Sequence, residues 1–297
     1  MTLKERMRGC LLGLAVGDAV GTTNEFKTRG TFKPITGIVG GGPFDLQPGQ
    51  WTDDTSMAMC LGTSLVESDG FDPDDVMERF VRWYQTGYWS STDACFDIGH
   101  TTKIALDTYM ATGVPWAPPS ERAGNGCIMR LAPVPMFYYP NTIAALEYAE
   151  KSAILTHNTP ACRESARLLS AMLLRAFSGT TKDYVLDAGL FLENTFEVPA
   201  VKSIAHGTYQ QKSIDAIHGT GFVVACLEAA AYCFAQTNSF GDAVLMAANL
   251  GDDADTTAAV TGQLAGAFYG VNAIPEAWRA QLARYTEIRD LADDLAQ

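Results

Sequence analysis

The chain has 297 residues, of which 47% are hydrophobic, enough to enclose one large core. Its formal net charge of −13 argues against binding to a nucleic-acid backbone, which requires clustered Lys and Arg. No apolar run approaches the roughly 18 residues of a membrane span, and Glu5 interrupts any signal-peptide pattern. We therefore expect a cytoplasmic protein without membrane association and, since no oligomerisation seam is visible, a monomer.

The seven cysteines argue against a disulfide or zinc framework. Their number is odd, and no two of them have C-x-x-C spacing. Most lie among Leu, Ala and Met, so we expect buried free thiols.

Taken in chain order, the apolar residues are spaced as in a series of helices with short connections. The segment 72–86 has the sharpest boundaries, with Asp72 at the N-cap, Pro73 in the first turn and Gly87 after the end. Alternating strand patterns are few, so we predict an all-α fold with residues 1–297 in one compact multi-helix domain. The predicted helices cover 3–17, 57–66, 72–86, 142–155, a segment from Pro160, 182–194, 220–236, 241–249, 256–269 and 275–293.

Two longer stretches, 27–52 and 112–126, have no helical pattern and contain Gly and Pro. Long loops in a compact domain are disproportionately functional. The first stretch leads into an acidic segment that starts at Trp51, and the second leads into a glycine-rich turn. Both stretches are therefore candidates for a functional role.

Two predicted helices carry small residues at every fourth position. Interior helix glycine costs roughly 1 kcal/mol relative to Ala, so a run of them needs a compensating reason. Spacing of four places these residues on one face, and we predict that each face crosses a neighbouring helix closely, with the other helix as a possible partner. The faces are Gly9, Gly13, Gly17 and Gly21 in the first helix, and Ala258, Gly262, Gly266 and Gly270 in the second.

Acidic residues and threonines cluster before two of the predicted helices. The clusters are Trp51-Thr52-Asp53-Asp54-Thr55 and Gly251-Asp252-Asp253-Ala254-Asp255-Thr256-Thr257. Asp and Thr are ordinary helix caps, so either cluster alone is open to that explanation. Five carboxylates in two short stretches exceed what capping needs, and they repel one another unless protons or cations intervene. Without interleaved His or Cys, the oxygen ligands favour Mg²⁺ or Mn²⁺ over zinc.

Smaller features accompany these clusters, and each has a structural alternative. Asp18 continues an apolar stripe, where we expect a buried acid bonded to backbone N–H groups, while Glu25 lies in a polar stretch that faces either a cleft or solvent. Asp97 and Gly99 precede a helix start, which is either simply capped or an anion pocket. Gly124-Asn125-Gly126 is a turn by composition, and a lone His157 is more often structural than catalytic.

Taken in order, these segments resemble the ADP-ribosylglycohydrolases, the family of the dinitrogenase reductase-activating glycohydrolase. The resemblance spans residues 13 to 270 and implies an all-α fold with a dinuclear Mg²⁺ or Mn²⁺ centre in a cleft. Its most specific part is the pairing of WTDDT with GDDADTTAA in this order. The matching stretches are GLAVGDAVG with Glu25, PGQWTDDT, FDIGHTT, AGNGCIMR, THN and NLGDDADTTAAVTGQLAGAFYG.

Carried over by position, the resemblance implies a role for each matching residue. Asp97 and Glu25 would be the catalytic carboxylates beside the metals and the ribose. Two positions depart from the family pattern, because His100 stands where many relatives have Asn and Phe222 where relatives often have Tyr. The implied metal ligands are Thr52, Asp53, Asp54, Asp253, Asp255 and Thr256. The implied substrate-binding residues are Gly99, His100, Thr101, Gly124, Asn125, Gly126, His157 and Phe222.

The expected activity is metal-dependent hydrolysis of the glycosidic bond between ADP-ribose and an acceptor, with arginine of an ADP-ribosylated protein as the favoured acceptor and ADP-ribose as the product. Cleavage at an anomeric carbon develops oxocarbenium character, and a metal lowers the pKa of a bound water that then attacks. Three alternatives remain open: another ADP-ribose conjugate (of serine, a small molecule or a nucleobase), a two-metal phosphoesterase, and a non-catalytic ADP-ribose binder.

Overall fold

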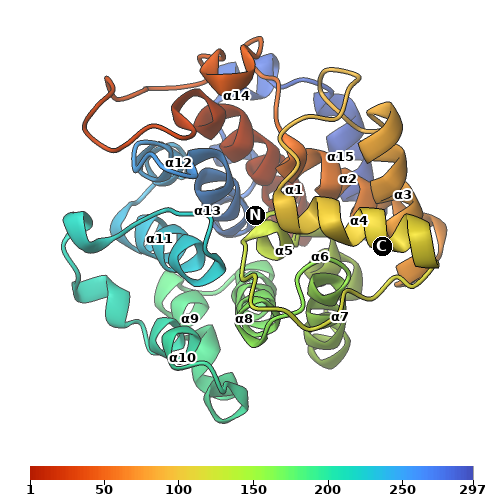
Figure 1. Ribbon diagram of the computed structural model, residues 1–297. Helices are drawn as coiled ribbons and strands as arrows, with labels where there is room; N and C mark the ends of the chain where they lie inside the picture. Colours follow the sequence, from red (N-terminus) through yellow and green to blue (C-terminus); the bar gives the residue numbers. More distant parts are fainter. Residues whose placement is uncertain (297) are drawn as a thin grey trace.

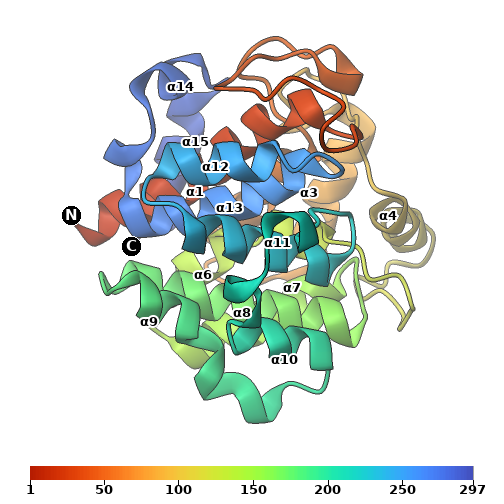
Figure 2. The same cartoon turned by 90° about the vertical axis from the view of Figure 1, so that its left-hand side faces the viewer.

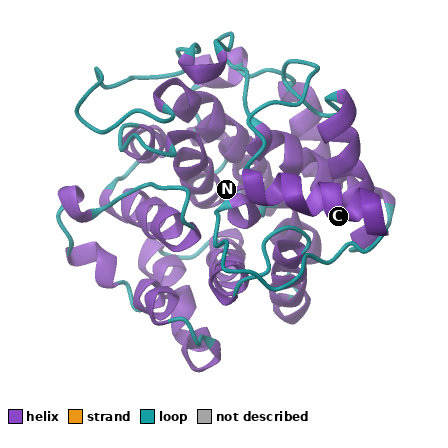
Figure 3. Ribbon diagram, in the orientation of Figure 1, coloured by secondary structure: helices purple, strands orange, loops and turns teal. Residues whose placement is uncertain are grey.

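The computed structural model describes residues 1–296, which form helices joined by loops (Figures 1 and 3). Within this part of the chain there are no strands, and only two isolated β-bridges occur, Gly41 with Leu46 and Gly124 with Phe222. The predicted all-α single domain is therefore confirmed. The helices are α1 (Leu3–Gly21), α2 (Asp53–Glu67), α3 (Pro73–Thr86), α4 (His100–Thr112), α5 (Gly126–Met129), α6 (Pro133–Tyr138), α7 (Thr142–Ile154), α8 (Pro160–Phe177), α9 (Lys182–Leu186), α10 (Pro199–Ala205), α11 (Val223–Gln236), α12 (Phe240–Ala248), α13 (Ala254–Tyr269), α14 (Glu276–Gln281) and α15 (Tyr285–Asp294).

Most predicted helices are present, but several have different limits. Helix α1 continues to Gly21 rather than ending at residue 17, and α2 begins at Asp53 rather than at residue 57. The segment 182–194 divides into α9 and a 3₁₀ segment over 187–195. The segment 275–293 divides at Arg284, where the backbone is left-handed and the neighbouring Ala283 N–H donates to the Gly49 carbonyl at 2.9 Å. Helix α11 starts at Val223 rather than residue 220, because the Val223 N–H pairs with the Ala123 carbonyl at 2.9 Å.

The two small-residue faces pack against each other, as the spacing predicted. α1 and α13 run side by side in opposite directions through the middle of the molecule (Figure 2). A Cβ atom added at Gly13 would overlap the Gly262 carbonyl, and one added at Gly9 would overlap the Gly266 carbonyl. At the end of this contact, Gly21 lies against Ala254, so the C-terminus of α1 meets the N-terminus of α13.

The other helices surround this central pair. α11 and α12 pack on α13, α15 packs on α1, and α7 and α8 pack together below them (Figures 1 and 2). Both central helices are buried almost all round, which explains their apolar character on every face. None of the described helices combines the length and hydropathy needed to cross a bilayer.

The seven cysteines are free thiols, as predicted. Six of them are buried, and Cys95 is partly exposed.

Candidate active site

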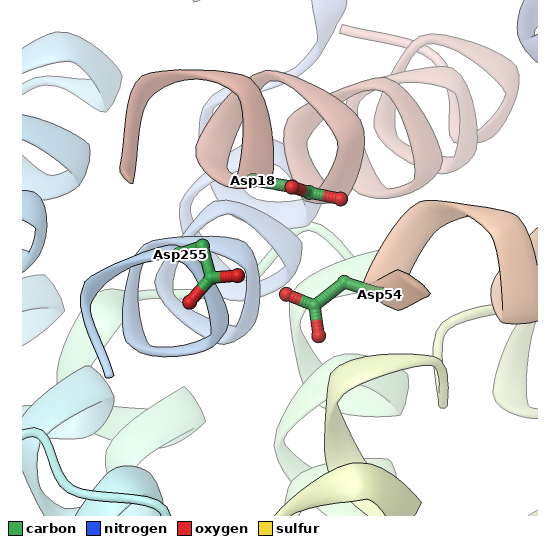
Figure 4. Close-up of side chains that lie close together, drawn as sticks. All are labelled: Asp18, Asp54 and Asp255. Atoms are coloured by element: carbon green, nitrogen blue, oxygen red, sulfur yellow. The ribbon is translucent and has the colours of Figure 1, made fainter. Parts of the chain in front are cut away.

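The two acidic clusters meet because their helices start at the same place. Asp54 in the first turn of α2 and Asp255 in the first turn of α13 point toward each other, with Asp18 of α1 beside them (Figure 4). The Thr256 hydroxyl donates to Asp54 at 3.1 Å, and the Thr52 hydroxyl lies 3.2 Å from an Asp255 oxygen. These hydrogen bonds connect residues that are about two hundred positions apart in the sequence.

Helix capping does not account for these clusters. Thr52 and Asp253 occupy the N-cap positions of α2 and α13, yet neither side chain accepts a hydrogen bond from its helix. Asp72 at the start of α3 shows the ordinary arrangement, since its side chain accepts from the N–H groups of Asp74 and Asp75. The carboxylates at the two clusters are therefore available for another purpose.

The carboxylates form two groups that could each hold a cation. Within each group, one oxygen from every residue lies within 4.8 Å of the others, and Asp255 belongs to both groups. This sharing places the two groups next to each other. The first group is Asp18, Asp54 and Asp255, and the second is Glu25, Asp97 and Asp255.

Asp18 already has hydrogen-bond partners for both of its oxygens. It accepts from the backbone N–H and the hydroxyl of Thr52, and from the backbone N–H and the hydroxyl of Thr55. This is the buried structural acid that the sequence predicted, although Asp18 lies close enough to join a metal group. Asp18 therefore holds the start of α2, whereas Asp54 and Asp255 each keep one buried oxygen without a hydrogen-bond partner.

The remaining carboxylates are poorly compensated within the protein. One oxygen each of Glu25, Asp54 and Asp255 is buried without a hydrogen-bond partner. Burial, together with neighbouring carboxylates, raises the pKa of Glu25 to about 10 and that of Asp97 to about 8, and it raises the pKa of Asp53, Asp54 and Asp255 well above the ordinary value. Such a cluster of hard oxygens fits a divalent cation, which would satisfy these oxygens and offset their charge.

A cavity of about 340 Å³ opens above these carboxylates, within the usual size range of small-molecule sites. No Lys or Arg is among the described residues that line it. Thr52 and Asp54 do not line it, and both are fully buried. Its lining comprises Glu25, Phe26, Asp53, Asp97, Ile98, Gly99, His100, Thr101, Thr102, Gly124, Asn125, Gly126, Met129, His157, Gly221, Asp253, Asp255 and Thr256.

The start of α4 provides backbone donors on one wall. Gly99 is the N-cap of this helix and makes no side-chain cap, so the first N–H groups, including that of Thr101, lack intrahelical acceptors. Asp97, two residues earlier, has a left-handed backbone with φ of 58°, which is uncommon for a residue with a side chain. Such a helix start favours anions and can bind a phosphate without basic side chains.

The glycine turn also lines the cavity, and His157 explains its glycines. A Cβ at Gly126 would lie 2.7 Å from Cε1 of His157, and one at Gly124 would lie 3.1 Å from its Nε2. Between the two glycines, the Asn125 amide donates to Asp253 at 2.9 Å. Asn125 therefore orients one of the clustered carboxylates.

The protonation of His157 follows from its neighbours. The Arg130 guanidinium, which can only donate, bonds to the Thr156 hydroxyl at 2.6 Å. That hydroxyl lies 2.7 Å from Nδ1 of His157, the one acceptor available for its proton among the described residues. Nδ1 is thus the acceptor and Nε2 carries the proton. Burial and the Arg130 charge lower the pKa of His157 to about 3, so the ring is a neutral donor facing the cavity.

The structure brings nearly all of the predicted site residues together. The exception is Phe222, which is 49% exposed and lies outside the cavity lining, next to Gly221. Arg130, in the matching stretch AGNGCIMR, makes no ion pair among the described residues. Its guanidinium donates to the Thr156 hydroxyl and the Ser152 carbonyl. It also contacts Met57 and the Phe80 ring. Phe26 also lines the cavity and was not among the residues predicted from the sequence, although its place directly after Glu25 could have indicated it.

Comparison with known proteins agrees with this geometry. A profile of the ADP-ribosylglycohydrolase family matches residues 1–297. The chain is 40% identical to a protein named ADP-ribosylarginine hydrolase from Serratia proteamaculans, covering 98% of this chain and 79% of that protein. A protein of the same name from Pseudomonas putida is 42% identical, with coverage of 98% and 78%.

A more distant relative and a solved structure agree. The chain is 32% identical to an ADP-ribosyl-dinitrogen reductase glycohydrolase from Rhodospirillum rubrum, covering 95% of this chain and 91% of that protein. A solved structure described as an ADP-ribosylglycohydrolase-related protein complex superposes with a TM-score of 0.88 at 39% identity, covering 99% of this chain and 98% of the other. On this fold, this site and these similarities, the chain belongs to the ADP-ribosylglycohydrolase family.

Proposed function

We propose that this protein hydrolyses the bond between ADP-ribose and an arginine side chain of a modified protein, using two divalent cations. The observation that supports the proposal is the pair of carboxylate clusters that have Asp255 in common and contain unpartnered buried oxygens. They lie beside a cavity with no Lys or Arg among its described lining residues. The two relatives named ADP-ribosylarginine hydrolase support arginine as the acceptor. A monomer located in the cytoplasm stays a prediction of the sequence.

The cations would be held by the residues that the sequence indicated, with threonine hydroxyls and carboxylates as oxygen ligands. Bound there, Mg²⁺ or Mn²⁺ would anchor ribose hydroxyls and activate a water molecule. The identity of the metal and the number of cations are part of the proposal. The proposed ligands are Thr52, Asp53, Asp54, Asp253, Asp255 and Thr256.

The protein itself would orient the substrate and handle the proton. Glu25 and Asp97 belong to the same carboxylate cluster as Asp255, and both line the cavity. Either can therefore accept a proton from the attacking water or stabilise the positive charge that develops on the ribose. The free N–H groups at the start of α4 would bind the pyrophosphate. His157 would donate from Nε2, and the other proposed contacts come from Gly99, His100, Thr101, Gly124, Asn125 and Gly126. Phe222 would contribute from the rim of the site.

The test is parallel hydrolysis of arginine-linked and serine-linked ADP-ribosylated proteins, each with Mg²⁺, with Mn²⁺ and with EDTA. We expect metal-dependent release of intact ADP-ribose from the arginine-linked protein. Release from the serine-linked protein alone would reassign the acceptor. AMP as the product would indicate a phosphoesterase, and tight ADP-ribose binding without turnover would indicate a binder.

A further inference from the structure

Phe26 is an exposed aromatic residue at the mouth of the active-site cavity. Phe26 is 69% exposed, whereas the preceding Glu25 is 4% exposed, and both residues line the same cavity. Glu25 therefore lies toward the floor and Phe26 toward the opening. A single exposed apolar residue is common on protein surfaces, but Phe26 is also held in place by its backbone and by neighbouring rings.

The backbone at Phe26 is held in an unfavourable conformation. Its φ of 60° is left-handed, a region that residues with a side chain seldom adopt. The Phe26 N–H donates to the Asp252 carbonyl at 2.7 Å, and the Asp252 N–H donates to the Lys27 carbonyl at 2.8 Å. This pairing joins the loop after Glu25 to the loop before Asp253 and fixes where the Phe26 ring lies.

Two further rings support Phe26. Phe44 lies 6.5 Å from Phe26 between ring centroids, at an interplanar angle of 74°, and Phe96 lies 5.2 Å from Phe44. An edge-to-face contact covers at most one face of the Phe26 ring, which agrees with its large exposure. A rigid aromatic surface thus stands beside the carboxylates with at least one face open.

This position is where the acceptor would lie. Under the proposed function, on which this inference rests, the scissile bond is next to Glu25 and Asp97, and the acceptor extends toward the mouth. A guanidinium group is planar and cationic, and it stacks well on an aromatic face. A serine acceptor offers neither a charge nor a plane, so an aromatic surface here would distinguish the two linkages.

We propose that Phe26 is a specificity-determining residue, forming the platform on which the guanidinium group of the acceptor arginine stacks. The contact is made by substrate in the ground state as well as during the reaction, so its loss should raise KM more than it lowers kcat. It involves no part of ADP-ribose itself. Affinity for free ADP-ribose should therefore be independent of the ring.

The experiment compares Phe26→Leu, Phe26→Ala and Phe26→Tyr with the wild type on an arginine-linked ADP-ribosyl peptide. None of these replacements is β-branched and each keeps a Cβ, so the backbone strain at this position is matched. We expect Phe26→Leu to lower kcat/KM by about two- to fivefold, mainly through KM, and Phe26→Ala by at least as much. Phe26→Tyr should stay within about twofold of the wild type, since the ring remains.

Two controls accompany these variants. Affinity for free ADP-ribose should not change in any of them. Tyr184→Leu makes the same kind of replacement at a residue that is 49% exposed in α9 and does not line the cavity, and it should leave all parameters unchanged.

If the wild type is active and Phe26→Leu has the same kcat/KM on the arginine-linked peptide, the proposed function stands and the inference is overturned. An equal loss of affinity for free ADP-ribose would also overturn it, because the ring would then contact the common part of every substrate. A wild type that binds ADP-ribose yet releases none from the arginine-linked peptide would refute the proposed function itself, and the inference with it.

Discussion

At the scale of single residues, the site depends on side chains that orient other side chains. Thr156 links the buried Arg130 to His157, and this link decides which nitrogen of the imidazole carries the proton. Without it, a buried histidine could present either nitrogen to the cavity. The hydrogen bonds from Arg130 through Thr156 to His157 therefore fix the Nε2–H group as a donor before any substrate binds.

Replacing Thr156 tests this arrangement. Thr156→Val keeps the shape but removes the hydroxyl, so His157 loses its fixed tautomer and we expect affinity for ADP-ribose to fall about fivefold or more. Thr156→Ser keeps the hydroxyl and should behave as the wild type. Nitrogen-15 NMR of the wild type should show the Nε2–H form at both pH 5 and pH 8, because the lowered pKa lies below this range. A proton on Nδ1 in the wild type would contradict the assignment.

Residue types at the site were predictable from sequence, whereas their contacts were not. The acidic clusters and their preference for Mg²⁺ or Mn²⁺ follow from composition and spacing alone. Asp255 belongs to both carboxylate clusters, and the Thr256 hydroxyl donates to Asp54. Both contacts depend on how helices that are distant in the sequence meet. The choice between capping and another role required the observation that Thr52 does not cap α2.

At the scale of elements, the crossing of α1 and α13 positions the site. The contact brings Gly21 against Ala254, so Glu25 and Asp255 extend from adjoining helix ends. Glycine spacing predicted this contact because only a close approach of backbones offsets the low helix propensity of glycine. The ends of α14 and α15 could not be predicted in the same way, since the break between them depends on Gly49 in a distant loop.

Adding one methyl group to this crossing should be costly. Gly13→Ala improves intrinsic helix propensity by roughly 1 kcal/mol, yet its Cβ would overlap the Gly262 carbonyl, so we expect a net loss of about 1–3 kcal/mol in the free energy of unfolding. Gly241→Ala in α12 is the matched control, because its Cβ meets nothing closer than 3.7 Å. That variant should be neutral or stabilised. Denaturant unfolding that found Gly13→Ala as stable as Gly241→Ala would refute the close crossing.

At the scale of the whole molecule, the fold carries an electrostatic cost at its centre. Carboxylates that repel one another are buried between α1, α2 and α13 in a protein with a net charge of −13. Packing elsewhere must offset this repulsion when no cation is bound. The site therefore trades stability for function, as binding and catalytic sites often do.

Thermal unfolding with and without metal measures that cost. Asp54→Asn removes one buried charge at nearly constant shape, so in EDTA at pH 8 we expect it to melt about 2 °C or more above the wild type. Mn²⁺ should raise the melting temperature of the wild type and raise that of Asp54→Asn by less than half as much. Asp45→Asn, at an exposed residue with the left-handed backbone that Asn tolerates, should respond to Mn²⁺ as the wild type does.

The pH dependence follows from the raised pKa values of the site carboxylates. A carboxylate whose pKa is higher in the folded than in the unfolded state binds protons preferentially when folded, so its contribution to stability falls as pH rises. In EDTA, the advantage of Asp54→Asn should therefore shrink as the pH is lowered from 8 to 6, because Asp97, with a pKa of about 8, and its neighbours take up protons in the wild type. A variant that melts below the wild type in EDTA, or one that keeps the full response to Mn²⁺, would show that Asp54 neither adds to the repulsion nor binds the cation.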